Sequence, residues 1–327
     1  MTVQAERESE LERSGVVMSD GVRLNVEVAG PADAPVTVLL VHGWTCSTRA
    51  WHNQVEDLPR ILGPDAVRVV SYDHRGHGRS DAAPAGSTQI SRLAEDLVTI
   101  LDEVVGAGPV VYAGHSMGGM TLMSLADTHP DLFAPTSTPG GPRICAAALI
   151  STSCGRISEG AFGIPKRFSP AAAAAAPRLM NLVGARVDRQ LDKLHSARSQ
   201  AAMPNRLVWA RRAGLRQVVF GRKADPAEVE LFLADLAVVP GASYGGFLEA
   251  ILQHDLGHAL KVLDQIPVEI MHGTRDRLLP PRHANRIAAE LPSARVWMYP
   301  GAGHMLMQER PRDVTHRLAS LARKVTA

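Results

Sequence analysis

One pentapeptide in the chain has the composition and spacing of a catalytic turn. Residues 114–118 read GHSMG and match the pattern G-x-S-x-G, with Ser116 at the centre. The apolar run Val110–Ala113 precedes the pattern, and a helix-like stretch follows it. The two glycines let a strand and a helix approach around a tight turn, which leaves the serine hydroxyl at the carboxyl end of the strand. This setting predicts a nucleophilic serine rather than an ordinary serine in a glycine-rich turn.

Two later residues could activate this serine. A serine hydroxyl is a poor nucleophile at neutral pH, so it needs a base, and the base needs an acid that orients it. Asp276 follows the strand-like run Val268–His272, and His304 lies in a glycine-rich loop after the next such run, Ala294–Tyr299. Because ligands of open α/β sheets collect at the carboxyl ends of the strands, we expect Ser116, Asp276 and His304 to meet there.

The oxyanion that forms on attack needs two N–H groups aimed at it. We expect one from the backbone of Met117, directly after the serine, and one from the backbone of Trp44, where Gly43 lets the loop turn inward. These are roles of the main chain, so the side chains at both positions are open to other uses. The alternative role of Trp44 is that of a wall of the substrate pocket.

The segment around residue 255 offers alternatives that we do not favour. Asp255 is a second candidate acid, but it lies on or beside a helix rather than after a strand. His254 and His258 have the i, i+4 spacing of a metal-binding pair, without the glutamate of H-E-x-x-H or a third ligand. We therefore interpret them as ordinary helix residues and expect neither a metal nor a cofactor.

Strands and helices must alternate to position these residues. Most strand-like runs are continuously apolar, which is typical of a mostly parallel sheet covered on both faces. The predicted strands are Val22–Val28, Val36–Val41, Val67–Tyr72, Val110–Ala113, Ala146–Ser151, Val268–His272 and Ala294–Tyr299. The predicted helices include Ser91–Val105, Met117–Asp127, Arg282–Leu291 and Pro311–Lys324. This alternation predicts an α/β fold with a doubly wound sheet.

The alternation stops between about residues 155 and 249. This part contains an alanine run at 171–176 and an arginine-rich helical pattern. We predict a helical cap over 155–249, inserted into an α/β core made of residues 1–154 and 250–327. The alanine run is either helix or low-complexity linker, because Pro170 and Pro177 bracket it too closely for a long helix.

The overall composition argues against several classes of protein. The 327 residues are 45% hydrophobic, enough for a large core, and a formal net charge of +2 gives no general attraction to nucleic acid. The N-terminal segment lacks the apolar stretch of a secretory signal, and no run of about 18 apolar residues predicts a membrane span. The three cysteines are sparse and have no C-x-x-C spacing, which favours a reducing compartment. We expect a cytoplasmic protein.

Five motifs together resemble those of the α/β-hydrolase family. They read HGW at 42–44, YDHRGHGRSD at 72–81, GHSMGG at 114–119, HGTRDRLLP at 272–280 and GAGHMLMQERP at 301–311. The resemblance implies an eight-stranded, mostly parallel sheet with a cap over the active site. It also implies Ser116 as nucleophile, His304 as base and Asp276 as acid, with Gly76 and Gly78 in a structural turn.

The serine directs the expected chemistry toward acyl transfer. Epoxide hydrolases and haloalkane dehalogenases of this fold use an aspartate where this chain has Ser116, so we expect an acyl-enzyme that water hydrolyses. The favoured function is a carboxylesterase or lipase-like enzyme acting on a small-molecule ester with an apolar acyl part. The same residues would serve a lactonase, a thioesterase, a C–C hydrolase, a perhydrolase or a biosynthetic acyl transferase, and some members of this fold are ligand-binding receptors.

The predicted cap carries an excess of positive charge. From Pro165 to Lys223, thirteen Lys and Arg residues are opposed only by Asp188 and Asp192. They form either the solvated faces of helices or a basic lid. Such a lid would attract an anionic substrate, an acidic carrier protein or an anionic lipid surface.

Overall fold

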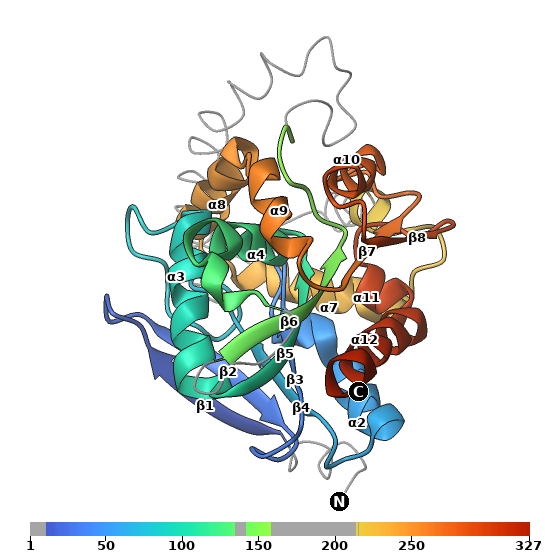
Figure 1. Ribbon diagram of the computed structural model, residues 1–327. Coiled ribbons are helices and arrows are strands. Elements are labelled where there is room, and N and C mark those ends of the chain that lie inside the picture. The colour runs from blue at the N-terminus through green and yellow to red at the C-terminus, as the bar shows by residue number, and fades with distance from the viewer. Residues whose placement is uncertain (1–10, 135–141, 158–213, 215) are drawn as a thin grey trace, which may run out of the picture.

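A mostly parallel sheet forms the centre of the computed structural model, which describes residues 11–134, 142–157, 214 and 216–327. The described residues contain eight strands in the order β1-β2-β4-β3-β5-β6-β7-β8 (Figure 1). The strands are β1 (Glu12–Val17), β2 (Arg23–Ala29), β3 (Thr37–Val41), β4 (Arg68–Tyr72), β5 (Gly108–His115), β6 (Pro142–Ile150), β7 (Val268–Gly273) and β8 (Arg295–Tyr299). β2 pairs antiparallel with β1 and β4, and the other pairs are parallel. The predicted α/β sheet is present.

The seven predicted strands correspond to β2 through β8, and β1 was not predicted. β1 reads ERSGVV, and its first three residues are exposed. It pairs only with β2, at the edge of the sheet. An edge strand with one neighbour needs no continuous apolar run, so its sequence lacks the signal that marks the buried strands.

Helices cover both faces of the sheet (Figure 1). One face packs against α3 (Ile90–Ile100), α4 (Met117–Thr128), α9 (Leu260–Leu263) and α10 (Arg282–Glu290), and the other against α2 (His52–Leu62), α11 (Leu306–Glu309) and α12 (Pro311–Thr326). The side chains of β5 alternate between these two cores, with Val110 and Tyr112 in one and Val111 and Ala113 in the other. The remaining short helical turns are Thr48–Trp51, Leu101–Val105, Pro130–Leu132 and Gly257–Ala259.

The chain between β6 and β7 contains two described helices, α7 (Pro226–Val238) and α8 (Gly241–Gln253). The alanine run at 171–176 and the basic residues of the predicted cap before Arg216 lie outside the described residues. α8 crosses the predicted boundary at residue 249. The helical cap and its limits stay predictions.

Length and apolar composition decide whether a helix can span a membrane. No single described helix is both long and apolar enough to cross a membrane. α7 and α8 meet that criterion only as a pair, and the chain bends by 105° between them.

Candidate active site

Ser116 occupies the tight turn between β5 and α4. Its φ of 52° and ψ of −113° form a strained backbone conformation for any residue other than glycine. The Ser116 N–H donates to the carbonyl oxygen of Ile150 (2.9 Å), and Thr152 Oγ1 donates to the Ser116 carbonyl oxygen (2.6 Å). The end of β6 and the loop after it therefore hold the serine in this conformation.

The glycines on either side of the serine permit close packing of the turn. A Cβ atom on Gly114 would lie 2.7 Å from the backbone of Gly118 and Gly119. A Cβ atom on Gly118 would collide with the carbonyl oxygen of Val41 at the end of β3. A side chain at either position would therefore push α4 away from the sheet. The strand, turn and helix predicted around GHSMG are present.

Asp276 and His304 lie in the loops after β7 and β8 and contact each other directly. His304 Nδ1 is 2.7 Å from Asp276 Oδ2, and both side chains are buried. The second carboxylate oxygen, Oδ1, accepts the N–H of Leu279 (2.9 Å). Because an ionised carboxylate can only accept hydrogen bonds, this contact favours the neutral tautomer of His304 that carries its proton on Nδ1 and keeps a lone pair on Nε2.

His115, the residue before Ser116, connects the serine turn to the loop between β8 and α11, which carries His304 and is called the histidine loop below. His115 Nε2 donates to the carbonyl oxygen of His304 (3.0 Å), and the centres of the two imidazole rings are 4.8 Å apart. Within the described part of the chain, no hydrogen bond joins the Ser116 hydroxyl to His304. The structure thus brings the three predicted residues to one edge of the sheet, with direct side-chain contact only between Asp276 and His304.

The loop after β3 packs against the serine turn. A Cβ atom on Gly43 would lie 2.7 Å from His115 Nδ1 and 2.9 Å from Ser116 Cβ. The next peptide N–H along the chain is that of Trp44, while Met117 is the first residue of α4 and its N–H has no acceptor within the helix. Both predicted oxyanion donors therefore belong to backbone segments next to the serine.

The side chain of Trp44 has a separate role. Its indole ring packs on Tyr244 of α8, with 4.4 Å between the ring centres. It also contacts a buried apolar cluster beside the serine turn. The members of the cluster are Ile90, Leu93, Met117, Met120, Ile157, Phe247, Ile251 and Leu279. Since Met117 follows the serine and Leu279 binds Asp276, this cluster borders the site with an apolar surface.

Two further buried histidines adjoin the Asp276–His304 pair. His272 Nε2 donates to the carbonyl oxygen of Leu279 (2.7 Å) and lies 3.5 Å from Asp276 Oδ2. Burial lowers the pKa of His272. Burial holds the pKa of His115 well below its ordinary value, and a proton taken up by His304 would lower it further. Both side chains are therefore neutral at pH 7 and add no positive charge beside the pair.

Glu309 fixes the histidine loop, and our sequence analysis did not single it out. Its Oε1 accepts the N–H of Gly303 (2.9 Å), and its Oε2 accepts the N–H of Gly221 (2.9 Å). The His304 N–H donates in turn to the carbonyl oxygen of Val219 (2.7 Å). One carboxylate therefore joins the segment before α7 to the loop that carries His304. A single glutamate in the sequence QERP gives no sign of a partner as far away in the chain as Gly221.

The alternative residues near position 255 lie apart from this pair. His304 contacts Asp276, whereas Asp255 is exposed beyond the end of α8, next to Gly155. His254 is buried at the end of α8, and His258 lies in a separate helical turn, where its Nε2 is 2.7 Å from Asp127. Across the described residues, no group of three or more His, Cys, Asp or Glu side chains is arranged to hold a metal ion.

Comparison with known proteins assigns the chain to a family. A model of the alpha/beta hydrolase family matches residues 38–317. The chain therefore belongs to the α/β-hydrolase family, as its five motifs, its sheet and its serine turn predict.

Relatives of the chain include several hydrolases. It is 29% identical over 318 residues to epoxide hydrolase A of Mycobacterium tuberculosis, covering 93% of this chain and 95% of that one. It is 25% identical over 312 residues to a bifunctional esterase/perhydrolase of Acinetobacter calcoaceticus, covering 94% and 99%. A thermophilic esterase of Thermogutta terrifontis has the same fold, with a TM-score of 0.69, 21% identity and coverage of 97% and 100%. Family and relatives together support a hydrolase.

Proposed function

We propose that this chain is a serine hydrolase that cleaves carboxylic esters with an apolar acyl group. The observation that carries this proposal is the 2.7 Å contact between His304 Nδ1 and Asp276 Oδ2 at the sheet edge where Ser116 begins a helix. A histidine held in this tautomer presents Nε2 as a base, and a serine on a strained turn is placed for attack.

The proposed reaction has two half-reactions. Ser116 Oγ attacks the ester carbonyl carbon while His304 takes its proton, and the N–H groups of Trp44 and Met117 stabilise the oxyanion. His304 then returns the proton to the leaving alcohol, which leaves an acyl group on Ser116. Water, activated by the same histidine, hydrolyses this acyl-enzyme, while Asp276 stabilises the imidazolium in both halves.

The serine favours esters over epoxides, although one relative is an epoxide hydrolase. A carboxylate that opens an epoxide forms an ester, which water can hydrolyse. A serine that opened an epoxide would form an ether, and an ether would not be hydrolysed by this machinery. Turnover through Ser116 therefore requires an acyl substrate, and the apolar cluster around Met117 and Leu279 favours a hydrocarbon acyl chain.

The test is covalent labelling followed by substrate profiling. The intact mass of the wild type and of Ser116→Ala is measured after treatment with a fluorophosphonate. We expect a single adduct on the wild type and none on the variant, followed by hydrolysis of p-nitrophenyl esters with a preference for acyl chains longer than acetate. A folded wild type that takes no adduct would contradict the proposal and favour a ligand-binding role for the fold.

A further inference from the structure

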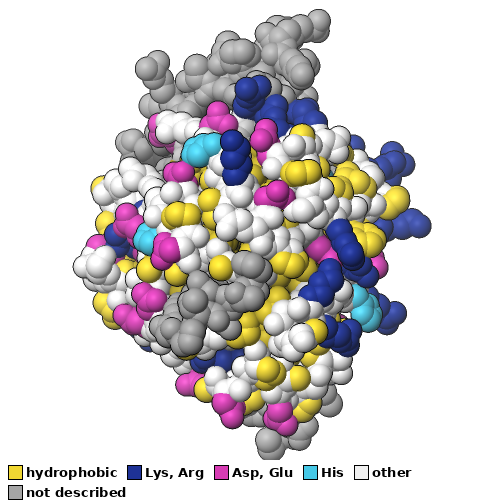
Figure 2. Space-filling model, viewed as in Figure 1, with side chains coloured by type: hydrophobic (Ala, Val, Ile, Leu, Met, Phe, Trp, Pro, Cys, Tyr) yellow, Lys and Arg dark blue, Asp and Glu magenta, His cyan; other side chains and the backbone are white. Residues whose placement is uncertain are grey.

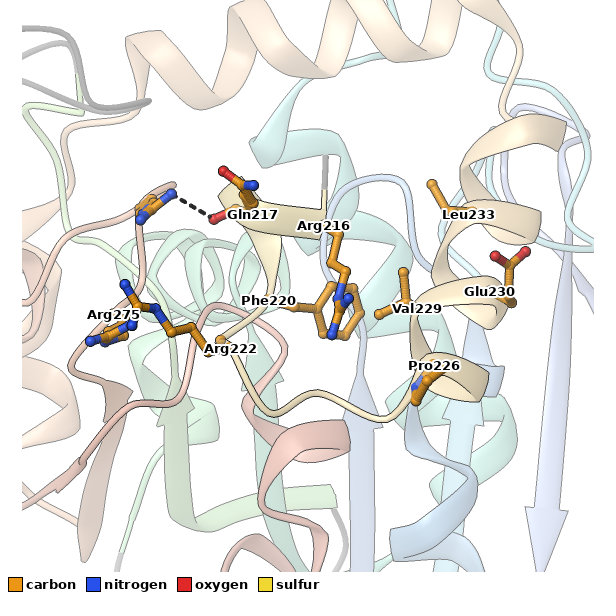
Figure 3. Close-up of a pocket in the computed structure, with 11 residues that line it drawn as sticks. Arg216, Gln217, Phe220, Arg222, Pro226, Val229, Glu230, Leu233 and Arg275 are labelled. Carbon is orange, nitrogen blue, oxygen red and sulfur yellow. Dashed lines mark hydrogen bonds between the residues drawn. The ribbon is translucent and has the colours of Figure 1, made fainter. Parts of the chain in front are cut away.

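A concave site lies outside the serine turn, in the chain between β6 and β7 and the loop after β7. It is a cavity of about 550 Å³ between residues 216–222, the first turns of α7 and the loop after β7 (Figure 3). Its lining includes neither Ser116 nor His304. It is therefore a different site from the candidate active site.

One part of the cavity wall is strongly basic. The lining includes Arg216, Arg222, Arg275 and Arg277, with Glu230 as its acidic member. All four arginines are exposed at the surface. Figure 2 shows Lys and Arg side chains gathered toward the right-hand and upper parts of the face in view.

Among the described residues, none of these arginines is paired with a carboxylate. Arg277 Nη1 donates to the carbonyl oxygen of Gln217 (3.1 Å), drawn as a dashed line in Figure 3. The positive charges of these guanidinium groups repel one another. An anion bound between the groups would be attracted to all of them and would offset this repulsion.

The opposite part of the wall is apolar. Phe220 and Val229 are buried in the core on this side of the sheet, and Leu233 packs against that core. In Figure 3, Val229 extends from α7 toward the ring of Phe220, and the side chain of Arg216 crosses in front of that ring. The cavity therefore combines an apolar surface with guanidinium groups at its margin.

We propose that this cavity binds an anionic amphiphile, a molecule with one carboxylate or phosphate head and a hydrocarbon tail. Guanidinium groups bind both head groups through paired hydrogen bonds. Packing the tail against Leu233, at the edge of the buried side chains of Phe220 and Val229, removes the apolar surface of the tail from water. A concave cavity of about 550 Å³ fits one such molecule and does not match the flat surface of a bilayer. The proposal does not depend on the role of Ser116.

Calorimetric titration of the full chain tests the head and the tail separately. The probes are decanoate, decyl phosphate, decanol and inorganic phosphate, each below its aggregation limit. We expect decanoate and decyl phosphate to bind at least tenfold more tightly than decanol or inorganic phosphate. Added NaCl should weaken the binding of both amphiphiles, because the head interacts with exposed arginines.

Two double variants locate the binding site. Arg222→Gln/Arg275→Gln should weaken decanoate binding at least tenfold. The control, Arg312→Gln/Lys261→Gln, removes the same charge from exposed positions outside the cavity and should change the affinity less than twofold. Leu233→Gln should weaken the binding of decanoate and leave the affinity for inorganic phosphate unchanged. Thermal unfolding of each variant verifies that it is folded.

Three outcomes would overturn the proposal. Equal decanoate affinity in the two double variants would place the ligand elsewhere. Inorganic phosphate that binds as tightly as decanoate would define a site for a free anion. Binding of the protein to phosphatidylglycerol vesicles without binding of monomeric decanoate would define a membrane-facing surface instead.

Discussion

Both oxygens of the Asp276 carboxylate accept hydrogen bonds, and these two bonds determine how an amide at this position would affect catalysis. Oδ1 accepts the N–H of Leu279 and Oδ2 accepts Nδ1–H of His304. An amide at this position offers one acceptor and one donor. When its oxygen accepts the N–H of Leu279, its NH2 group faces His304 Nδ1 and favours the tautomer whose Nε2 is protonated and cannot serve as a base.

We therefore expect Asp276→Asn to lower kcat for ester hydrolysis by roughly three to four orders of magnitude, with little change in KM. Steady-state kinetics on a p-nitrophenyl ester is the measurement. The matched control is Asp255→Asn, which changes the other candidate acid and should retain wild-type kcat. A large loss in Asp255→Asn with an active Asp276→Asn would reverse our assignment of the acid.

Single residues differ in how well the sequence predicts them. Ser116, Asp276 and His304 could be chosen because each follows a strand, and parallel strands bring their carboxyl ends to one edge. Glu309 and Thr152 could not be chosen in this way. Gly221, one of the partners of Glu309, and Ser116, the partner of Thr152, lie far away in the chain, and the path of the main chain through space decides that they meet.

At the scale of elements, the carboxylate of Glu309 holds the loop between β8 and α11 against the segment before α7. Glu309 accepts two backbone N–H groups, one from Gly303 in this loop and one from Gly221 in the segment before α7. Burial raises the pKa of Glu309, while the two N–H donors stabilise its charged form. The position of His304 therefore depends on the contact between two separate segments.

We expect Glu309→Gln to lower kcat about tenfold while KM changes less than twofold. The amide has one acceptor oxygen, so one of the two N–H groups loses a hydrogen bond to a charged acceptor, worth about 1.5–3 kcal/mol. Kinetics and thermal unfolding are measured together, with Glu290→Gln on the exposed end of α10 as the control. An unchanged kcat in a variant of lower thermal stability would show that the two hydrogen bonds of Glu309 stabilise the fold but do not affect catalysis.

The elements themselves were predicted best where they are buried. β3, β5 and β7 lie inside the sheet, and their continuous apolar runs come from burial on both faces. The predicted helix Ser91–Val105 is α3 followed by a wider helical turn, Leu101–Val105, which ends at Gly106. Apolar periodicity continues through both, so the sequence does not reveal the change in hydrogen bonding between them.

At the scale of the whole molecule, buried neutral histidines make stability depend on pH. Burial lowers the pKa of His42, His254 and His283 from 6.5 to about 4. Above pH 6.5 each is neutral in the folded and the unfolded chain, and its contribution to stability is complete. Between pH 6.5 and 4 the unfolded chain binds a proton that the folded chain does not, so stability falls as the pH is lowered.

Removing one of these histidines isolates its effect. His283 Nδ1 is 2.8 Å from Ser153 Oγ, and His283→Asn keeps a polar side chain at this position. In urea unfolding from pH 7.5 to 4.5, we expect the two proteins to behave alike above pH 6.5, and the variant to lose about 1.4 kcal/mol less stability per pH unit than the wild type between pH 6.5 and 4.5. Buried carboxylates such as Asp96, whose pKa burial raises, contribute equally to both proteins. Parallel pH curves for the two proteins would contradict the prediction.

The order of the strands has a consequence for synthesis. Ser116 follows β5, whereas Asp276 and His304 follow β7 and β8, and α12 packs on α2 and on β5 only after these loops exist. A ribosome that has completed β6 has made Ser116 and the strand that holds its turn, but neither of its proposed partners. The proposed esterase activity would therefore begin only when the segment that carries β7, β8 and α12 has left the exit tunnel, so its onset would report the completion of this edge of the sheet. Until then the nascent chain would carry a serine without a base.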